Sequence, residues 1–141
     1  MKAAQILKEW AMRYVKNRVS SLEGIIATEE QGNSIIMRRK DGSATYVVEP
    51  VFDIKTAKKG ITIVALSNST NIDAIAKNWG TLSKLKGMKI ILANPFSTQE
   101  ERWSISPEIH NRICDRKTLK LGLKAMAELV DPITEKEIEA K

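Results

Sequence analysis

The sequence predicts an α/β fold: a single domain over residues 1–141, in which α-helices flank a mixed β-sheet. Two short runs are almost wholly apolar, Ile61–Leu66 and Met88–Ala93, and the segment between them has helical spacing. Strands this apolar are usually covered on both faces, and a helical connection usually makes such strands parallel. We therefore expect adjacent parallel strands in the interior of one sheet, with Trp79 packed against them.

The first predicted element is an amphipathic helix over Ala3–Arg18. Its apolar residues recur at helical spacing; they are Ala3, Ile6, Leu7, Trp10, Tyr14 and Val15. Trp10 and Tyr14 lie one turn apart on the predicted inner face. Stacking on nucleic-acid bases is one role for such a pair, but packing in the core is the interpretation we favour.

Three strands should follow, at Gly24–Thr28, Ser34–Arg39 and Ala44–Val48, the last continuing toward Phe52. Asp-Gly between two β-forming runs is a strong hairpin signal, so Asp41-Gly42 predicts a tight turn. Pro50 lacks the N–H that a ladder needs and therefore indicates a bulge or an edge.

The connecting helix is predicted over Ile72–Lys86, with Asn71 as its N-cap and Gly87 just past its end. Its inner face should carry Ile72, Ile75, Ala76, Trp79, Leu82 and Leu85. Beyond the second apolar run we expect a polar loop at Thr98–Arg102 and a short helix beginning at Ser106-Pro107. A last long helix over Arg116–Val130, capped by Asp115, and a capping box at Thr134-x-x-Glu137 complete the chain.

Composition limits the function classes. The 141 residues are 43% hydrophobic, contain one cysteine, Cys114, and show neither an apolar run of bilayer length nor a segment of signal-peptide form. A cytoplasmic location is the expectation. The formal charge of +6 favours polyanionic partners, nucleic acid first, although many basic proteins bind none.

The distribution of charge says more than its sum. From Ala74 to Asn94 there are four lysines and no acid, and further basic clusters occur at residues 38–40 and 58–59, whereas acids gather near the C-terminus. The candidate nucleic-acid-binding residues are Arg38, Arg39, Lys40, Lys77, Lys84 and Lys86. Lysine-rich faces also serve solubility, which is the alternative interpretation.

A second set of residues suggests metal-dependent chemistry. The strand region contains three acids followed by a lysine, namely Asp41, Glu49, Asp53 and Lys55. Acids near strand ends can hold a Mg²⁺ ion that stabilises charge on a phosphodiester, and a lysine can orient the attacking water or neutralise the transition state. Glu49, Asp53 and Lys55 are therefore the candidate catalytic residues. His110 and Cys114 lie four residues apart, but two ligands without a second pair do not make a zinc site.

The order helix, antiparallel strands, helix, strand resembles the core of the PD-(D/E)xK nuclease superfamily, the restriction-endonuclease-like fold, over roughly Ala3–Ala93. In that superfamily an acid sits on the second core strand, and (D/E)-x-K sits on the third, just before the helix. Here the corresponding residues are Val64-Ala65-Leu66-Ser67, without acid or lysine. An alternative alignment uses Asp41 and Asp53-x-Lys55 but places an extra strand before the helix.

Polar side chains also follow both apolar runs. Asn68 and Asn71 come after the first and Asn94 after the second, and crevices beyond the carboxyl ends of parallel strands commonly bind ligands. Together with His110 these residues form a candidate ligand crevice. The alternative, loop capping by Asn and Ser, is the interpretation we favour.

The resemblance and the charge together predict a nucleic-acid-associated protein of nuclease-like fold with weak or no catalysis. One alternative is a non-enzymatic subunit that docks on a protein partner or on another copy of itself. Another is a magnesium-dependent nuclease that uses Asp41, Asp53 and Lys55. No metal site and no cofactor are expected, Mg²⁺ excepted if the protein is a nuclease.

Overall fold

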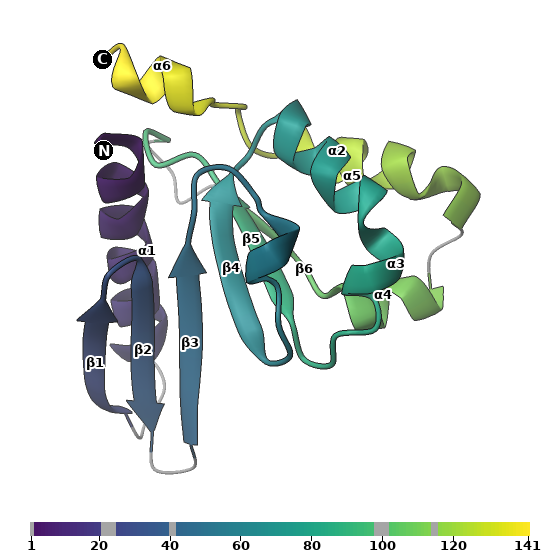
Figure 1. Cartoon of the computed structure of the whole chain (residues 1–141). Helices are drawn as coiled ribbons and strands as arrows, with labels where there is room; N and C mark the ends of the chain where they lie inside the picture. Colours follow the sequence, from purple (N-terminus) through teal and green to yellow (C-terminus); the bar gives the residue numbers. More distant parts are fainter. Residues whose placement is uncertain (1, 21–24, 40–41, 98–101, 114–115) are drawn as a thin grey trace.

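The chain folds around a six-stranded mixed sheet in which the strands follow one another in space in their order along the chain, β1-β2-β3-β4-β5-β6 (Figure 1). The computed structural model describes residues 2–20, 25–39, 42–97, 102–113 and 116–141. The strands are β1 Ile25–Gln31, β2 Ser34–Arg39, β3 Gly42–Val48, β4 Ile61–Leu66, β5 Lys89–Ala93 and β6 Arg102–Ile105. The α/β class with a mixed sheet flanked by helices is thus confirmed.

The strand directions divide the sheet into a meander and a parallel centre. Strands β1, β2 and β3 are antiparallel, β3-β4 and β4-β5 are parallel, and β6 is antiparallel to β5. The prediction for Ile61–Leu66 and Met88–Ala93 is confirmed, because both are interior strands and pair in parallel, although β5 itself starts at Lys89. The hairpin between β2 and β3 is also present, but Lys40 and Asp41 lie outside the described residues.

The helices form a layer on each face of the sheet. Helix α1, Lys2–Ser20, and α6, Glu135–Glu139, lie on one face. The other face carries α2 Ser69–Lys77, α3 Trp79–Leu82, α4 Pro107–Ile113 and α5 Leu119–Ala127. The described residues also form the 3₁₀ turns η1, Ile54–Thr56, before β4 and η2, Arg116–Thr118, before α5. Among the described residues, no helix has both the length and the apolar character that crossing a bilayer requires.

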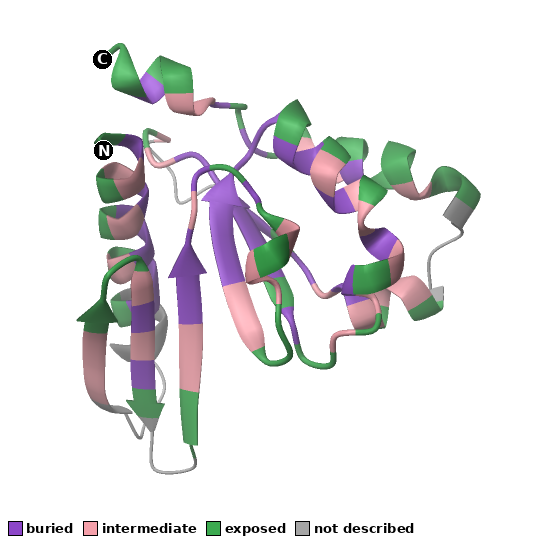
Figure 2. Cartoon of the chain, viewed as in Figure 1, coloured by how far each residue is buried: buried purple, intermediate pink, exposed green. Residues whose placement is uncertain are grey.

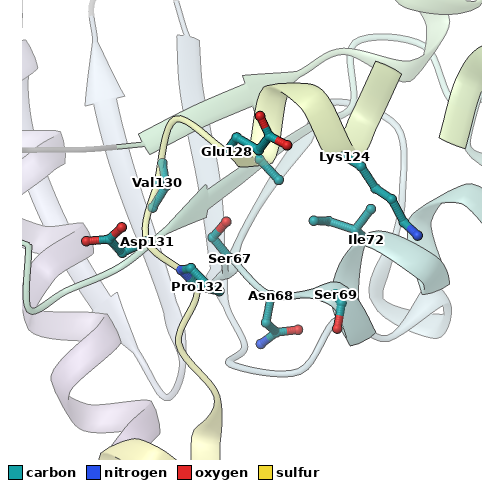
Figure 3. A pocket seen from close by; sticks show the side chains of 10 residues that line it. Ser67, Asn68, Ser69, Ile72, Lys124, Glu128, Val130, Asp131 and Pro132 are labelled. Atoms are coloured by element: carbon teal, nitrogen blue, oxygen red, sulfur yellow. The ribbon is translucent and has the colours of Figure 1, made fainter. Parts of the chain in front are cut away.

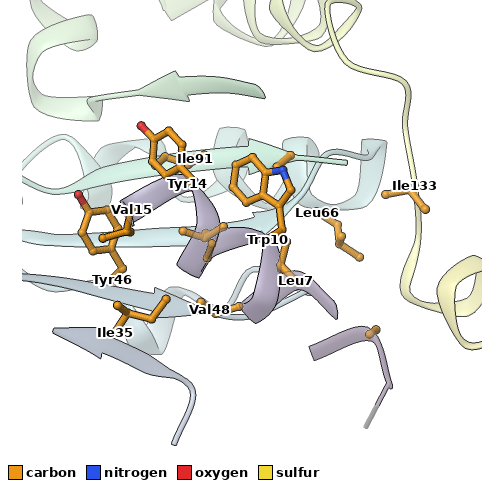
Figure 4. Packing of buried hydrophobic residues seen from close by; sticks show 14 of the residues in the cluster. Leu7, Trp10, Tyr14, Val15, Ile35, Tyr46, Val48, Leu66, Ile91 and Ile133 are labelled. Carbon is orange, nitrogen blue, oxygen red and sulfur yellow. The ribbon is translucent and has the colours of Figure 1, made fainter. Parts of the chain in front are cut away.

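Two hydrophobic clusters fill the spaces between the sheet and its helices. Under α1, Trp10 and Tyr14 stack with their ring centroids 5.4 Å apart and are 5% exposed, which makes them core residues (Figure 4). Under α2 and α3, Ile75, Trp79 and Leu82 pack on the opposite face of β4 and β5. The predicted inner faces of both helices are therefore confirmed.

Burial falls along the parallel strands toward their amino ends. The last four residues of β4 are buried and its first two are half-buried, and β3 changes from exposed to buried along its length (Figure 2). The carboxyl ends of these strands thus lie in the interior of the protein, whereas their amino ends lie at the surface.

Several boundaries differ from the predicted ones. The connecting helix is two helices, because the Asn78 amide donates to the carbonyl of Ala74 at 2.8 Å and the backbone leaves helical geometry there. The N-cap is Asn68, whose Oδ1 accepts from the N–H of Asn71. Asn71 therefore does not cap the helix; its side chain points inward instead.

Differences also occur after β5. Arg102, expected in a loop, begins strand β6, whose Trp103 and Ile105 are buried against β5. The last long helix, expected over Arg116–Val130, is the turn η2 followed by the nine-residue α5. The capping box is confirmed, since Thr134 and Glu137 make both of its reciprocal hydrogen bonds.

Candidate nucleic-acid interface

The predicted catalytic residues lie together in the connection between β3 and β4, but their hydrogen bonds close a turn. The two carboxylate oxygens of Glu49 accept from the Asp53 N–H at 3.1 Å and from the Thr56 hydroxyl at 2.9 Å. One oxygen of Asp53 accepts from the Lys55 N–H at 2.9 Å and caps η1. Glu49 and Asp53 are thus neighbours, yet both act as local caps.

The Glu49 carboxyl group is half-buried in this turn. Burial raises the pKa of Glu49 above its ordinary value of 4.5, an effect opposed by its hydrogen bonds and reinforced by the nearby Asp53. Among the described residues no three His, Cys, Asp or Glu side chains gather as ligands for a metal ion. Asp41 lies outside those residues.

The predicted ligand crevice is filled by the protein's own hydrogen bonds. The buried Asn71 amide accepts from the Phe52 N–H at 2.8 Å. It donates to the carbonyls of Pro50 and Leu66 at 2.9 and 2.7 Å. One side chain therefore joins the end of β4, the exit from β3 and the start of α2.

The C-terminal segment crosses the same end of the sheet. Asn68 donates to the carbonyl of Ile133, Asn94 donates to that of Asp131, and the Ile133 N–H donates to the carbonyl of Ser67, all at 2.9 Å. The asparagines thus bind backbone, as the loop-capping alternative expects.

His110 does not join the asparagines. Its Nδ1 lies 3.1 Å from the Ser106 nitrogen at the start of α4. Ser106 follows Ile105, which pairs with Ile90 at the amino end of β5, whereas Asn94 follows the carboxyl end of β5. The expectation that His110 converges with Asn68, Asn71 and Asn94 is wrong, because β6 runs antiparallel and carries the chain back along the sheet.

A cavity of about 500 Å³ remains beside the crossing C-terminal segment, between the end of β4, the first turn of α2 and the end of α5 (Figure 3). Its apolar lining comes from Ile72, Ala127, Val130 and Pro132. Asn68 is the one member of the predicted crevice that lines it, and both ends of that amide already bind backbone.

The opposite end of the sheet collects lysines from two separate turns. Lys58 and Lys59 precede β4, whereas Lys84 and Lys86 precede β5, which begins at Lys89. The turns touch, because the Gly60 N–H donates to the carbonyl of Lys86 at 3.0 Å, and a Cβ on Gly87 would lie 3.7 Å from the Gly60 Cα. We call the five residues Lys58, Lys59, Lys84, Lys86 and Lys89 the basic end.

All five lysines of the basic end are exposed, and within the described part of the chain none of them pairs with a carboxylate. The acidic helix α6 lies at the other end of the sheet (Figure 1). The sequence identified Lys58, Lys59 and Lys89 as basic residues but did not place them beside the candidates Lys84 and Lys86, because only the contact between the two turns brings the five together.

The remaining predicted basic residues lie elsewhere or are engaged. Arg38 makes two contacts with the Glu29 carboxylate on β1, at 3.2 and 3.3 Å. Lys77 ends α2 and is exposed. Only the backbone of Arg39 is described, at the end of β2. No family model, curated protein or solved structure matches this chain.

The Asn71 amide makes a first prediction possible. Asn71→Ala leaves the Phe52 N–H and the Leu66 carbonyl without their buried side-chain partner, and each such group costs roughly 1–3 kcal/mol. The Pro50 carbonyl loses one hydrogen bond but keeps the one from the Leu66 N–H at 3.2 Å. We expect the free energy of unfolding, measured by urea denaturation, to fall by about 3 kcal/mol or more. Asn78→Ala, which removes one part-buried bond, is the matched control and should cost about 1 kcal/mol. Equal losses would contradict the role of Asn71.

Glu49 provides a second prediction. Because its pKa is raised on folding, its contribution to stability is complete below about pH 4.5 and is lost as the pH rises through the raised pKa. Glu49→Gln removes this titration. Thermal unfolding at a series of pH values should therefore show the difference in Tm, wild type minus variant, decreasing from mildly acidic to neutral pH. A difference that stays constant over that range would show that Glu49 ionises as easily in the folded protein as in the unfolded chain.

Proposed function

We propose that this protein associates with nucleic acid through the basic end, and that it does so without efficient catalysis. The observation that carries the proposal is the meeting of two lysine-bearing turns at one surface, remote from the acidic helix α6. Clustered lysines without carboxylate partners attract phosphates and release counterions when they bind.

The location of the basic end supports an interface that the sheet itself positions. Lys89 belongs to β5, and the other four lysines lie in turns directly before β4 and β5. Because these strands are buried along most of their length, the turns have well-anchored ends. The backbone that carries these lysines therefore needs little reordering when a strand of nucleic acid binds.

Fold-level similarity to the PD-(D/E)xK nuclease superfamily is part of the same proposal. The resemblance expects a helix, then antiparallel strands, then a helix that leads to a further strand. This chain has the same order, with α1, then the meander β1-β2-β3, then α2 and α3 between the parallel strands β4 and β5. Strand β4 stands between the meander and α2, however, so the residues before the helix are Val64 to Ser67, which lack an acid and a lysine. A nuclease-like frame with a degraded active site accounts for both features.

A second candidate is a non-enzymatic subunit in which α5 packs against another copy of this chain. Leu121 on α5 and Leu129, just past the end of that helix, are each 70% exposed. A concentration-dependent dimer in sedimentation experiments, together with no binding of nucleic acid, would favour this candidate over the first.

Charge reversal at the basic end tests the interface. The double variant Lys84→Glu, Lys86→Glu should bind labelled duplex DNA and RNA more weakly than the wild-type protein. The slope of log K against log salt should decrease in magnitude by about 2, one for each lysine that no longer neutralises a phosphate. Fluorescence anisotropy at several salt concentrations measures both effects.

The matched control is Lys2→Glu, Lys136→Glu, which changes the net charge equally at exposed positions on α1 and α6. It should keep nearly the affinity and slope of the wild-type protein. If the two double variants lose equal affinity, binding depends on net charge and the basic end is not the interface.

Catalysis is tested separately. We expect no robust cleavage of single-stranded, duplex or branched DNA with Mg²⁺ or Mn²⁺, because both oxygens of Glu49 already cap the turn and an ion needs carboxylates free to bind it. Cleavage that disappears in both Asp53→Asn and Lys55→Ala would show instead that Asp53-Ile54-Lys55 is a working motif.

A further inference from the structure

A row of polar side chains crosses the amino ends of the central strands on the face that α1 covers. Tyr46 of β3 pairs with Thr62 of β4, and Thr62 pairs with Lys89 of β5. Side chains alternate between faces along a strand, so these residues share the face of Val48, Val64 and Ile91, which pack under α1. The row therefore replaces apolar residues on a face that is otherwise part of the core.

Other elements complete the same polar surface. Ser104 of β6 pairs with Ile91, and Ser106 follows two residues later toward the amino end of β5. Tyr14 comes from α1, and Figure 4 shows its hydroxyl on the same side as that of Tyr46. Together they enclose a cavity of about 150 Å³ whose polar lining comes from Tyr14, Tyr46, Thr62, Lys89, Ser104 and Ser106.

The chemistry of this lining is selective. Among the described residues that line it, Lys89 carries an ammonium group and Thr62, Ser104 and Ser106 carry hydroxyl groups, whereas Tyr14 and Tyr46 already have other partners, and none of these residues is a carboxylate. Hydroxyls and a lysine are donors that nucleic-acid-binding proteins direct at phosphate oxygens, where lysine acts as a point charge. A cation would be repelled by Lys89 and would find no carboxylate among the described lining residues, and an apolar ligand would displace water from the hydroxyls of Thr62, Ser104 and Ser106.

We propose that this cavity, which we call the hydroxyl pocket, binds a phosphate group of a nucleic-acid strand that lies across the basic end. The proposal rests on the proposed function and deepens it, since Lys89 belongs both to the basic end and to the pocket. The lysines of the two turns supply sequence-independent attraction, and the hydroxyl pocket fixes the position of one phosphate relative to the sheet.

Two substitutions separate charge from hydrogen bonding. Lys89→Met keeps most of the aliphatic side chain and removes the ammonium group, so affinity should fall about tenfold and the salt slope should decrease in magnitude by about 1. Thr62→Val keeps shape and charge and removes one hydroxyl, so affinity should fall several-fold while the salt slope stays unchanged. Fluorescence anisotropy with a labelled oligonucleotide, as single strand and as duplex, measures both.

Each variant has a matched control. Lys136→Met makes the same change on the acidic helix α6, and Thr45→Val makes the same change on β3, where Thr45 neighbours Tyr46 but faces the opposite side of the sheet. Both controls should bind as the wild-type protein does. An oligonucleotide with and without a 5′-phosphate distinguishes the source of the phosphate. A Thr62→Val effect on both oligonucleotides assigns an internal phosphate, and a Thr62→Val effect on the phosphorylated strand alone assigns a terminal one.

The outcomes that overturn the proposal are distinct from those that overturn the proposed function. If wild-type protein binds no nucleic acid, both fail. If wild-type protein binds, and Thr62→Val binds no more weakly than Thr45→Val, the hydroxyl pocket holds no phosphate, and any loss in Lys89→Met belongs to the basic end, which the Lys84, Lys86 variant tests by itself. Circular dichroism and thermal unfolding of each variant identify any loss of affinity that comes from unfolding.

Discussion

The buried side chain of Asn71 is the junction on which the centre of this fold depends. Its three hydrogen bonds connect the chain leaving β3, the end of β4 and the first turn of α2. Strands β3 and β4 are parallel although only η1 and irregular backbone connect them, so no long helix braces that crossover. Buried backbone groups must find partners, and here one amide serves three of them.

This junction is one reason why few polar side chains at the carboxyl ends of the parallel strands are available to bind a ligand. In open α/β sheets, ligands usually bind beyond those ends. Here Asn68, Asn71 and Asn94 are each bound to backbone, and the segment around Ile133 crosses the same edge. Asn68 and Asn94 hold the C-terminal segment that leads to α6, and Asn71 holds the exit from β3 and the end of β4.

How much could be predicted from the sequence depended on whether a signal was local. Apolar runs indicated β4 and β5, and the Thr134–Glu137 box indicated α6, because burial and capping leave local patterns. Asn68 and Asn71 are both good caps three residues apart, and nothing local distinguishes the cap from the residue turned inward. Strand β6 is too short to show a clear period. The basic end and the hydroxyl pocket required strand register, which one sequence does not reveal.

The register also explains how β4 and β5 can carry core residues along most of their length and polar side chains at their amino ends. Along β4 the side chains on the α1 face run from Thr62 through Val64 to Leu66, and along β5 they run from Lys89 through Ile91 to Ala93. Each strand is therefore polar at its amino end and apolar beyond it, so the core anchors the same strands that present donors at the surface. The side chains that anchor these strands in the core therefore differ from the polar ones at their amino ends, so a substitution such as Thr62→Val tests the phosphate site that we propose without altering the buried residues. A protein that binds one phosphate at a defined position needs this rigidity, since flexible lysines alone attract a polyanion but do not fix its register.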